Sequence, residues 1–432
     1  MTLRVLTPIC PSLKSFTEGM ANVMRRLSLS RTYLIPRRAA HKSGRQRGFS
    51  LVEVMVGLLI SLIGTLAMMT AFASFEAQKR TTTSGSDAQQ AGSYSLFEMA
   101  RQLRTAGSAI EQGRDPTFNT WMCSISARTS AAATMPLPAP LAPPFDVVSA
   151  VSLNVRAIPA LVYSGGTDGA GKALPDVIAV ISGNPAVRTF GAKMTTVPPP
   201  PATAAVMADT TFGTYANEYL LASDGSGACR LAHVAPTFIS DPTGAIKTVP
   251  FDVPNTAGNG FATPAQAYVF DLGVNPTFSL YGVNTTSNRL VAYDLLQRNG
   301  AAPVEIADGI VLVKALYGVD DGASGGTAND GVIDEWVVPT GATWGAAALS
   351  TPAAALSIPQ IKAIRVAVVA RSQLPERTIA ADPVNGYAGP VPITLFSDLP
   401  AALQFSVNTD PQYRYKTYDT TIPLHNAAVK IL

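Results

Sequence analysis

The sequence predicts an α+β protein in which a long N-terminal helix, membrane-spanning in its first half, precedes a β-rich region. The first observation is Val54–Phe75, a run of 22 residues without a charged side chain. The second is the recurrence of apolar residues at three-to-four spacing between residues 96 and 110, which is typical of an amphipathic helix. The third begins near residue 113, where short apolar or alternating runs are separated by Gly, Pro, Asn and Asp, as in strands joined by turns.

The apolar run is long enough to cross a membrane. As a helix it would measure about 33 Å, close to the thickness of a bilayer core. A helix buried in a soluble core would need apolar contacts on every side. Residues 1–48 contain ten Lys or Arg residues and a single acid, Glu18, so the positive-inside rule places this end in the cytoplasm and everything after residue 76 beyond the inner membrane.

The remainder of the chain is net acidic, which argues against binding to a nucleic-acid phosphate backbone as its main role. No direct nucleic-acid site is evident. The sequence therefore favours a membrane-anchored protein over a nucleic-acid-binding one.

A carboxylate stands at the start of the apolar run. The segment RGFSLVEVMVGLLIS begins at Arg47 and places Glu53 five residues after Gly48. A lone acid at this depth is costly and usually has a partner. The segment resembles the type IV prepilin signature, which implies that prepilin peptidase cuts between Gly48 and Phe49 and that Phe49 is then N-methylated.

The resemblance also assigns roles to these residues. Gly48 has no side chain and can lie extended in a protease cleft. In a filament, Glu53 of one subunit could neutralise the new amine of a neighbour, which would make burial of both charges tolerable. The implied partners are prepilin peptidase, other minor and major pilins, the inner-membrane pilus assembly machinery and the inner membrane itself.

The resemblance divides the chain into four parts. Residues 1–48 form a basic leader that is removed, and residues 49–112 form a hydrophobic and then amphipathic pilin helix whose outer half packs on a β-sheet. Thr81–Ser86 contains poor helix formers, so we expect a kink or a melted turn there. Residues 113–300 form a β-rich insertion or head region, and residues 301–432 a C-terminal β region.

The region after residue 113 is long for a single pilin head, so we expect a large insertion or a second β lobe. The Pro-rich stretches Met135–Pro144 and Val197–Pro201 cannot occupy central strands. The expected strands are Val147–Val155, Val177–Ile181, Tyr219–Ala222, Cys229–Val234, Tyr268–Leu272, Phe278–Val283, Arg289–Leu295, Ile310–Val319, Ile361–Ala370 and Tyr415–Ile422.

A second resemblance covers about the last 120 residues. It is carried by the segments Ala315–Asp320, Asp330–Trp336, Ile361–Ser372, Tyr413–Tyr415 and Thr420–Asn426. In this order, and behind a prepilin motif, they look like PilW-type minor pilins. Residues 113–300 carry no comparable resemblance.

Four acids cluster in a Gly-rich stretch of this C-terminal region: Asp320, Asp321, Asp330 and Asp334. Oxygen-rich turns suit calcium, which takes six to eight oxygen ligands. The spacing is not that of an EF-hand, and a solvated turn between two strands explains the same residues, since Asp and Gly supply turn geometry. Calcium is the one cofactor that the sequence leaves open.

Cys123 and Cys229 are the only cysteines after the leader. In an oxidising periplasm such a pair usually forms a disulfide, although two separate thiols would fit the sequence as well. Two histidines remain after the leader, without a nucleophile elbow or a set of ligands at zinc spacing. We therefore expect no enzymatic activity.

These inferences combine into one functional expectation. The chain should be a minor pilin that is anchored by a single span in the inner membrane with a periplasmic head, and that then joins a type IV pilus at the cell surface. The family is associated with assembly and priming, and so with twitching motility, adhesion or DNA uptake. A minor pseudopilin of type II secretion and a pilin-anchored surface adhesin are the alternatives.

Overall fold

The structure, a computed structural model, has an α+β architecture with one long helix and several sheets. It consists of two compact units, Met1–Ala71 and Phe72–Leu432, and we call the second unit the head. It describes residues 48–110, 121–129, 132–169, 171–188, 190–196, 202–208, 210–223, 225, 227–255, 267–298, 300–375, 392–410 and 412–428.

Helix α2 runs from Leu51 to Thr105. It is helical through Thr81–Ser86, so the expectation of a melted turn there is wrong. A helix that has already formed on both sides of a weak segment needs no new nucleus to continue through it. The modest propensity cost of Thr, Ser and Gly is too small to open the helix.

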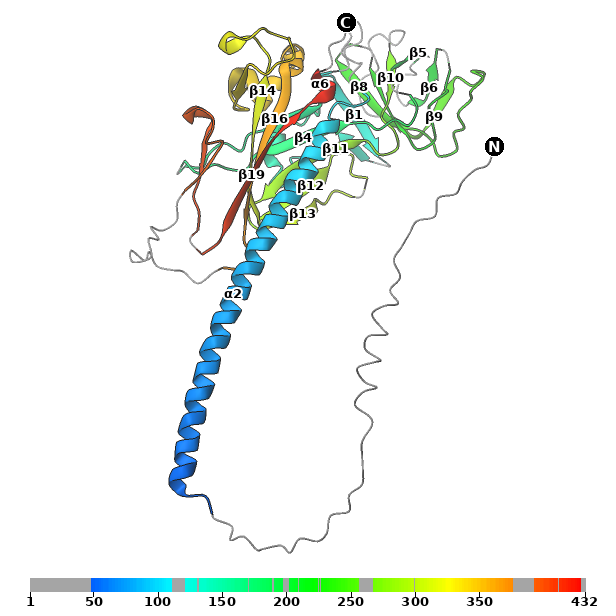
Figure 1. The fold of residues 1–432 in the computed structure, drawn as a ribbon. Helices are drawn as coiled ribbons and strands as arrows, with labels where there is room; N and C mark the ends of the chain where they lie inside the picture. Colours follow the sequence, from blue (N-terminus) through cyan, green and yellow to red (C-terminus); the bar gives the residue numbers. More distant parts are fainter. Residues whose placement is uncertain are drawn as a thin grey trace, which may run out of the picture. The chain divides into compact units, whose positions relative to one another are not determined.

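Eight strands form the largest sheet of the head, in the order β2-β1-β8-β7-β10-β5-β6-β9. Strands β1 and β8 pair in parallel, whereas the other neighbours in this sheet pair antiparallel. The bounds are β1 Ser124–Thr129, β2 Ala132–Met135, β5 Ala192–Thr196, β6 Ala202–Met207, β7 Tyr219–Ser223, β8 Ala228–His233, β9 Thr248–Asn255 and β10 Tyr268–Asp271. In Figure 1, β5, β6, β8, β9 and β10 gather at one side of the head.

A five-stranded antiparallel sheet combines strands from distant parts of the chain, in the order β13-β12-β11-β4-β3. The bounds are β3 Ala160–Tyr163, β4 Val177–Ser182, β11 Thr277–Asn284, β12 Arg289–Asp294 and β13 Val304–Asp308. Residue 300, where the sequence suggested a boundary, falls between β12 and β13 of this one sheet.

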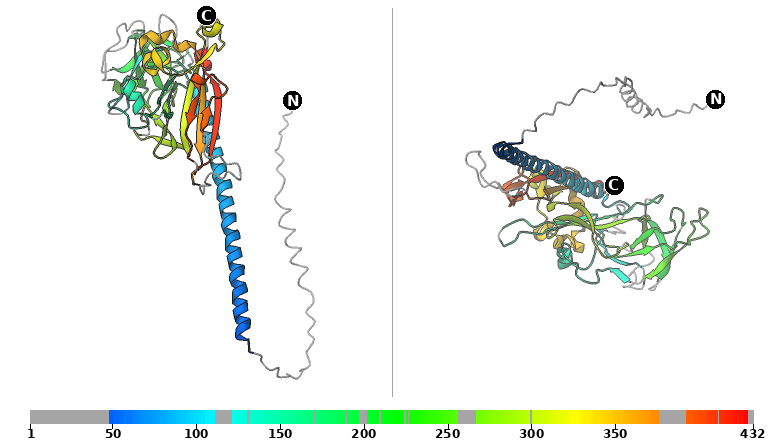
Figure 2. Two further views of the ribbon diagram at one scale, coloured as in Figure 1. Left: turned by 90° about the vertical axis from the view of Figure 1, so that its left-hand side faces the viewer. Right: turned by 90° about the horizontal axis from the view of Figure 1, so that it is seen from below.

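A four-stranded antiparallel sheet has the order β15-β14-β16-β19, and β14, β16 and β19 lie side by side in yellow, orange and red in Figure 2. The bounds are β14 Ile310–Val319, β15 Glu335–Val337, β16 Ile361–Arg371 and β19 Tyr415–Pro423. A separate hairpin consists of β17 Ile393–Leu395 and β18 Phe405–Val407. Short helical segments join the strands: α3 Asp146–Val151, η3 Ala323–Gly325, α4 Gly341–Trp344, α5 Ala346–Leu349, η4 Pro352–Ala355, η5 Ile358–Gln360, η6 Ala401–Leu403 and α6 His425–Ala428.

The head part of α2 packs on the four-stranded sheet, as the pilin resemblance implied. Met99 and Leu103 belong to the same buried cluster as Ile364 and Val366 of β16. Gly92 makes the approach close, because a β-carbon there would collide with the ring of Tyr418 on β19. The apolar face of the helix thus completes the core that one face of the sheet begins.

The expected strands are largely confirmed, with one clear error. Val147–Val155 is not a strand, because Asp146–Val151 forms α3. A short apolar run fits either period. Here only Val148 is buried, while Asp146 in the first turn interacts favourably with the helix dipole. The Pro-rich stretch Met135–Pro144 begins at the last residue of β2, and its prolines lie beyond that strand. Val197–Pro201 lies outside the described residues.

Candidate assembly site

The first half of α2 is apolar and exposed. Leu51–Glu76 consists mainly of apolar residues, and its large hydrophobic side chains are exposed. It is the one helix among the described residues that is long and apolar enough to cross a membrane. A core helix of a soluble protein would be buried, so the exposure of this segment, together with its prepilin motif, suggests anchoring in the inner membrane.

Three hydroxyl groups of this segment form hydrogen bonds within the helix. The hydroxyls of Ser61, Thr65 and Thr70 each donate a hydrogen bond of 2.9 Å to the carbonyl three residues earlier. A hydroxyl that is already bonded within its own helix adds little cost in an apolar environment. The surface of the helix is therefore suited to lipid and to the side chains of other apolar helices.

The residues of the cleavage motif lie at the start of α2. Gly48, Phe49 and Ser50 precede the first helical residue and are exposed, and the backbone N–H of Val54 donates to the Ser50 carbonyl over 3.2 Å. Glu53 is exposed in the first turn of the helix. Among the described residues, no cation lies within ion-pair distance of Glu53, so a charge partner would have to come from outside them.

The head part of α2 has two different faces. Ser95, Met99 and Leu103 are buried, whereas Tyr94 and Phe97, three residues apart, are 50% and 64% exposed. Neighbours at this spacing form a continuous strip on a helix surface. The strip presents aromatic area where another subunit could pack.

The end of α2 is held by the C-terminal region. The side-chain amide of Asn426 donates to the carbonyls of Thr105 and Ala106 over 3.3 and 3.1 Å. These carbonyls have no partner within the helix. Gly107 follows with φ +80°, a conformation that glycine adopts without strain. The segment Thr420–Asn426, singled out for its resemblance, thus fixes the helix to the sheet.

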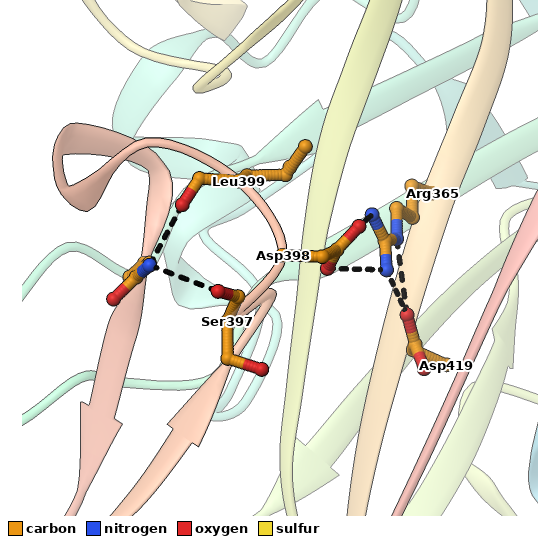
Figure 3. A network of polar contacts seen from close by, with 6 residues as sticks. Arg365, Ser397, Asp398, Leu399 and Asp419 are labelled. Carbon is orange, nitrogen blue, oxygen red and sulfur yellow. Dashed lines mark hydrogen bonds and ion pairs between the residues drawn. The ribbon is translucent and has the colours of Figure 1, made fainter.

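Arg365 holds a hairpin against the edge of the four-stranded sheet. Its guanidinium forms ion pairs with Asp398 at 2.7 Å and with Asp419 of β19 at 2.5 Å, as Figure 3 shows. It also lies 5.2 Å from the ring centre of Phe396. The hydrogen bonds from Arg365 lower the pKa of Asp398. Residues 396–398, in the turn after β17, are thereby tied to β16 and β19.

The four acids proposed for calcium are engaged within their own loop. Asp320, Asp321, Asp330 and Asp334 each accept a backbone N–H of that loop over 2.7–3.0 Å. Asp320 is buried and lies 3.4 Å from the Lys362 ammonium. Within the described ranges, no group of three or more His, Cys, Asp or Glu side chains could hold a metal ion. The four carboxylates thus take part in the hydrogen bonding of the loop between β14 and β15.

Cys123 and Cys229 are joined in a disulfide, with Cα atoms 5.5 Å apart. Cys123 directly precedes β1, and Cys229 pairs with Ile125 in the register of β1 and β8. The bond therefore links the two parallel strands of the largest sheet. Both cysteines are buried.

The roles of three residues that hold the head together were not predicted from the sequence. Asp176 and Lys314 form a buried ion pair, and Asn426 caps α2. The signal for the pair was Lys314 itself, a single charge in the otherwise apolar strand Ile310–Val319. Its partner lies 138 residues away, and nothing local in the sequence indicates it.

Comparison with known families gives two matches. Residues 279–426 match the family model of the type IV pilus-assembly protein W, and residues 43–69 match the prokaryotic N-terminal methylation motif. No curated protein and no solved structure matches the chain. The first segment contains the strands on which α2 packs, and the second contains Gly48, Phe49 and Glu53. Together the two matches support a type IV pilus pilin of the PilW type.

Proposed function

We propose that the protein is a minor pilin, made as an inner-membrane precursor and incorporated into a type IV pilus. Prepilin peptidase cuts between Gly48 and Phe49, and Phe49 becomes the N-methylated first residue. The observation that carries the proposal is the methylation motif at the start of a helix that is long and apolar enough to cross a membrane and is not buried in the protein.

The exposed helix supports two successive environments. Before assembly, lipid covers the apolar side chains of Leu51–Glu76 while the head stands in the periplasm. During assembly the same side chains pack against the helices of other major and minor pilins. Helix association in this setting depends on close packing and on polar pairs, and Glu53 supplies the polar group.

The role of the head is recognition of neighbours. Tyr94 and Phe97 give α2 an aromatic strip outside the membrane segment. The PilW-type region, which holds the end of α2 through Asn426, supports a part in assembly or priming, and through the pilus in twitching motility, adhesion or DNA uptake. A minor pseudopilin of type II secretion would share the helix and the motif, but the PilW match favours the pilus.

A pilin-anchored adhesin is the second candidate function. All strands of the eight-stranded sheet lie before residue 279, where the match to PilW begins. This added sheet supports a surface function beyond assembly. The two functions are compatible, because an adhesin at the pilus surface would still be processed and assembled as a pilin.

The test is the mature N-terminus of the protein taken from its native membrane. Intact mass and N-terminal sequencing, in cells with and without prepilin peptidase, should give N-methyl-Phe49 only when the peptidase is present. A chain that keeps residues 1–48 in both strains would contradict the proposal. A strain that produces a catalytically inactive peptidase is the matched control, because cleavage in that strain would come from other proteases.

A further inference from the structure

The eight-stranded sheet carries a cleft of about 540 Å³. It is lined by the segments before β5 and after β6 and by the first residue of β10. Figure 1 draws β5, β6 and β10 in green. This volume is in the range of small-molecule sites. The described residues that line it are Val187, Arg188, Phe190, Gly191, Ala192, Lys193, Met207, Thr210, Phe212 and Tyr268.

The rim of the cleft is aromatic and exposed. Phe190 is 62% exposed and Phe212 is 51% exposed, although each could have been buried at a gain of about 2 kcal/mol. Val187, which also lines the cleft, is exposed as well. Exposed apolar side chains that cluster around a cleft often mark a binding site, whereas single exposed apolar residues are ordinary.

Arg188 builds a wall of the cleft. Its guanidinium donates hydrogen bonds to the carbonyls of Thr210 and Phe212, over 2.9 and 2.5 Å. The side chain is buried, so its charge is used inside the protein. This anchor fixes the segment that presents the Phe212 ring.

Lys193 supplies a charge that faces solvent. It is exposed in β5, and among the described residues no carboxylate lies within ion-pair distance of its ammonium. The described lining contains no acidic side chain. A ligand with an anionic group would therefore meet an attractive charge, whereas a cationic one would be repelled.

We propose that this cleft binds a compound that combines an aromatic or other apolar group with a single anionic group. The apolar part would lie between Phe190 and Phe212, and the anionic group would face Lys193. Aromatic rings prefer offset or edge-to-face contacts with such rings. The proposal goes beyond pilus assembly and does not depend on it, because it uses residues 187–268 of the head alone.

Photo-crosslinking of the full-length protein in detergent tests the proposal. The probe is 4-benzoylbenzoate, an aromatic carboxylate, and the neutral 4-methylbenzophenone is its matched control. Peptide mapping separates labelling of the cleft from labelling of the apolar helix Leu51–Glu76. We expect saturable labelling by the carboxylate in peptides that contain Phe190, Met207 or Phe212, and weaker labelling there by the neutral probe.

Two variants assign the roles within the cleft. Lys193→Gln should weaken binding of the carboxylate probe by roughly three- to fivefold, as expected for one exposed charge pair. Labelling by the neutral probe should be unchanged. Phe212→Ala should weaken the binding of both probes, and the control Lys416→Gln on β19 should change the binding of neither. Labelling spread over the head, equal labelling by the two probes, or a Lys193→Gln variant without effect would each overturn the proposal.

Discussion

Lys314 and Asp176 form an ion pair in the interior of the head, with side chains that are 1% and 0% exposed. Lys314 belongs to β14 of the four-stranded sheet, and Asp176 directly precedes β4 of the five-stranded sheet. Asp176 also accepts the backbone N–H groups of Ala315 and Gly165, both over 3.0 Å. The pair therefore joins two sheets that share no strand.

Replacing Asp176 with Ala should lower the free energy of unfolding of the head by about 3–5 kcal/mol, because it leaves a buried ammonium without a counter-charge. The measurement is denaturant unfolding of the detergent-solubilised protein, followed by tryptophan fluorescence. All three tryptophans, Trp121, Trp336 and Trp344, lie in the head.

The double variant Asp176→Leu with Lys314→Met removes both charges and should recover part of the loss, although the two backbone N–H groups lose their acceptor. Lys416→Met at an exposed position of β19 is the control and should change little. A loss below about 1 kcal/mol for Asp176→Ala would contradict the importance of the pair.

Two buried carboxyl groups make the eight-stranded sheet sensitive to pH. Asp271 ends β10 and Glu218 directly precedes β7, the strand that pairs with it, and both are buried. Burial raises the pKa of Asp271 to about 7, and the nearby charge of Glu218 acts in the same direction, whereas Arg188 and the Gly273 N–H oppose it. Since the pKa is about 3.9 in the unfolded chain, this group stabilises the fold fully below pH ~4.

That contribution is lost as the pH rises through about 7. We expect the head of the wild-type protein to be less stable at pH 8 than at pH 5, by up to about 3 kcal/mol from this group. Asp271→Asn should flatten the dependence and raise stability at pH 8. Thermal unfolding between pH 5 and pH 8 measures this pH dependence of stability. The same pH dependence in the wild type and in Asp271→Asn would contradict the prediction.

Strands with a clear apolar or alternating pattern could be predicted from the sequence, whereas strands without one could not. Strand β14 has the expected bounds, and β16 and β19 extend one residue beyond them. Strands β5 and β6, with sequences AKMTT and ATAAVM, lack the β-branched and aromatic alternation that signals a strand. They form because neighbouring strands supply hydrogen bonds and cover their buried methionines, and that information is not local.

The same distinction applies to the candidate sites. The motif around Gly48, Phe49 and Glu53 is contiguous, so its spacing can be read directly. The cleft at Phe190 and Phe212 depends on two segments that only the fold brings together. The acidic loop was recognised as a cluster, but composition could not say whether its oxygens converge on a cation or accept hydrogen bonds from the loop itself.

Asp320 organises that loop, and its removal should destabilise it. Burial alone would raise the pKa of Asp320, but the N–H of Gly331 and the Lys362 ammonium outweigh burial and lower it. The stabilising contribution is therefore present above pH ~4, the unfolded value, and is lost as the pH falls through the lower folded pKa. Asp320→Asn should cost about 1–3 kcal/mol at neutral pH, and the difference from wild type should shrink in acid.

Calcium provides the complementary test of this loop. Because its four carboxylates already accept loop N–H groups, calorimetric titration of the full-length protein with millimolar calcium should give no saturable heat. Asp334→Asn in the same titration is the matched control. A saturable signal in wild type that disappears in Asp334→Asn would establish calcium binding instead.

Glu53 should be dispensable for processing and required for incorporation. The peptidase acts on the exposed backbone at Gly48 and Phe49, which precede the helix, whereas Glu53 lies in its first turn. Once cleavage has created a positive amine at Phe49, burial of that amine among apolar helices needs a negative partner. Glu53→Ala should therefore accumulate as mature protein in the membrane and be absent from sheared pili.

Glu76→Ala, at the far end of the apolar segment, is the control and should assemble. Glu53→Gln separates charge from hydrogen bonding, because it keeps the shape but not the charge. Mature Glu53→Ala found in pili at the wild-type level would show that the amine is neutralised in some other way.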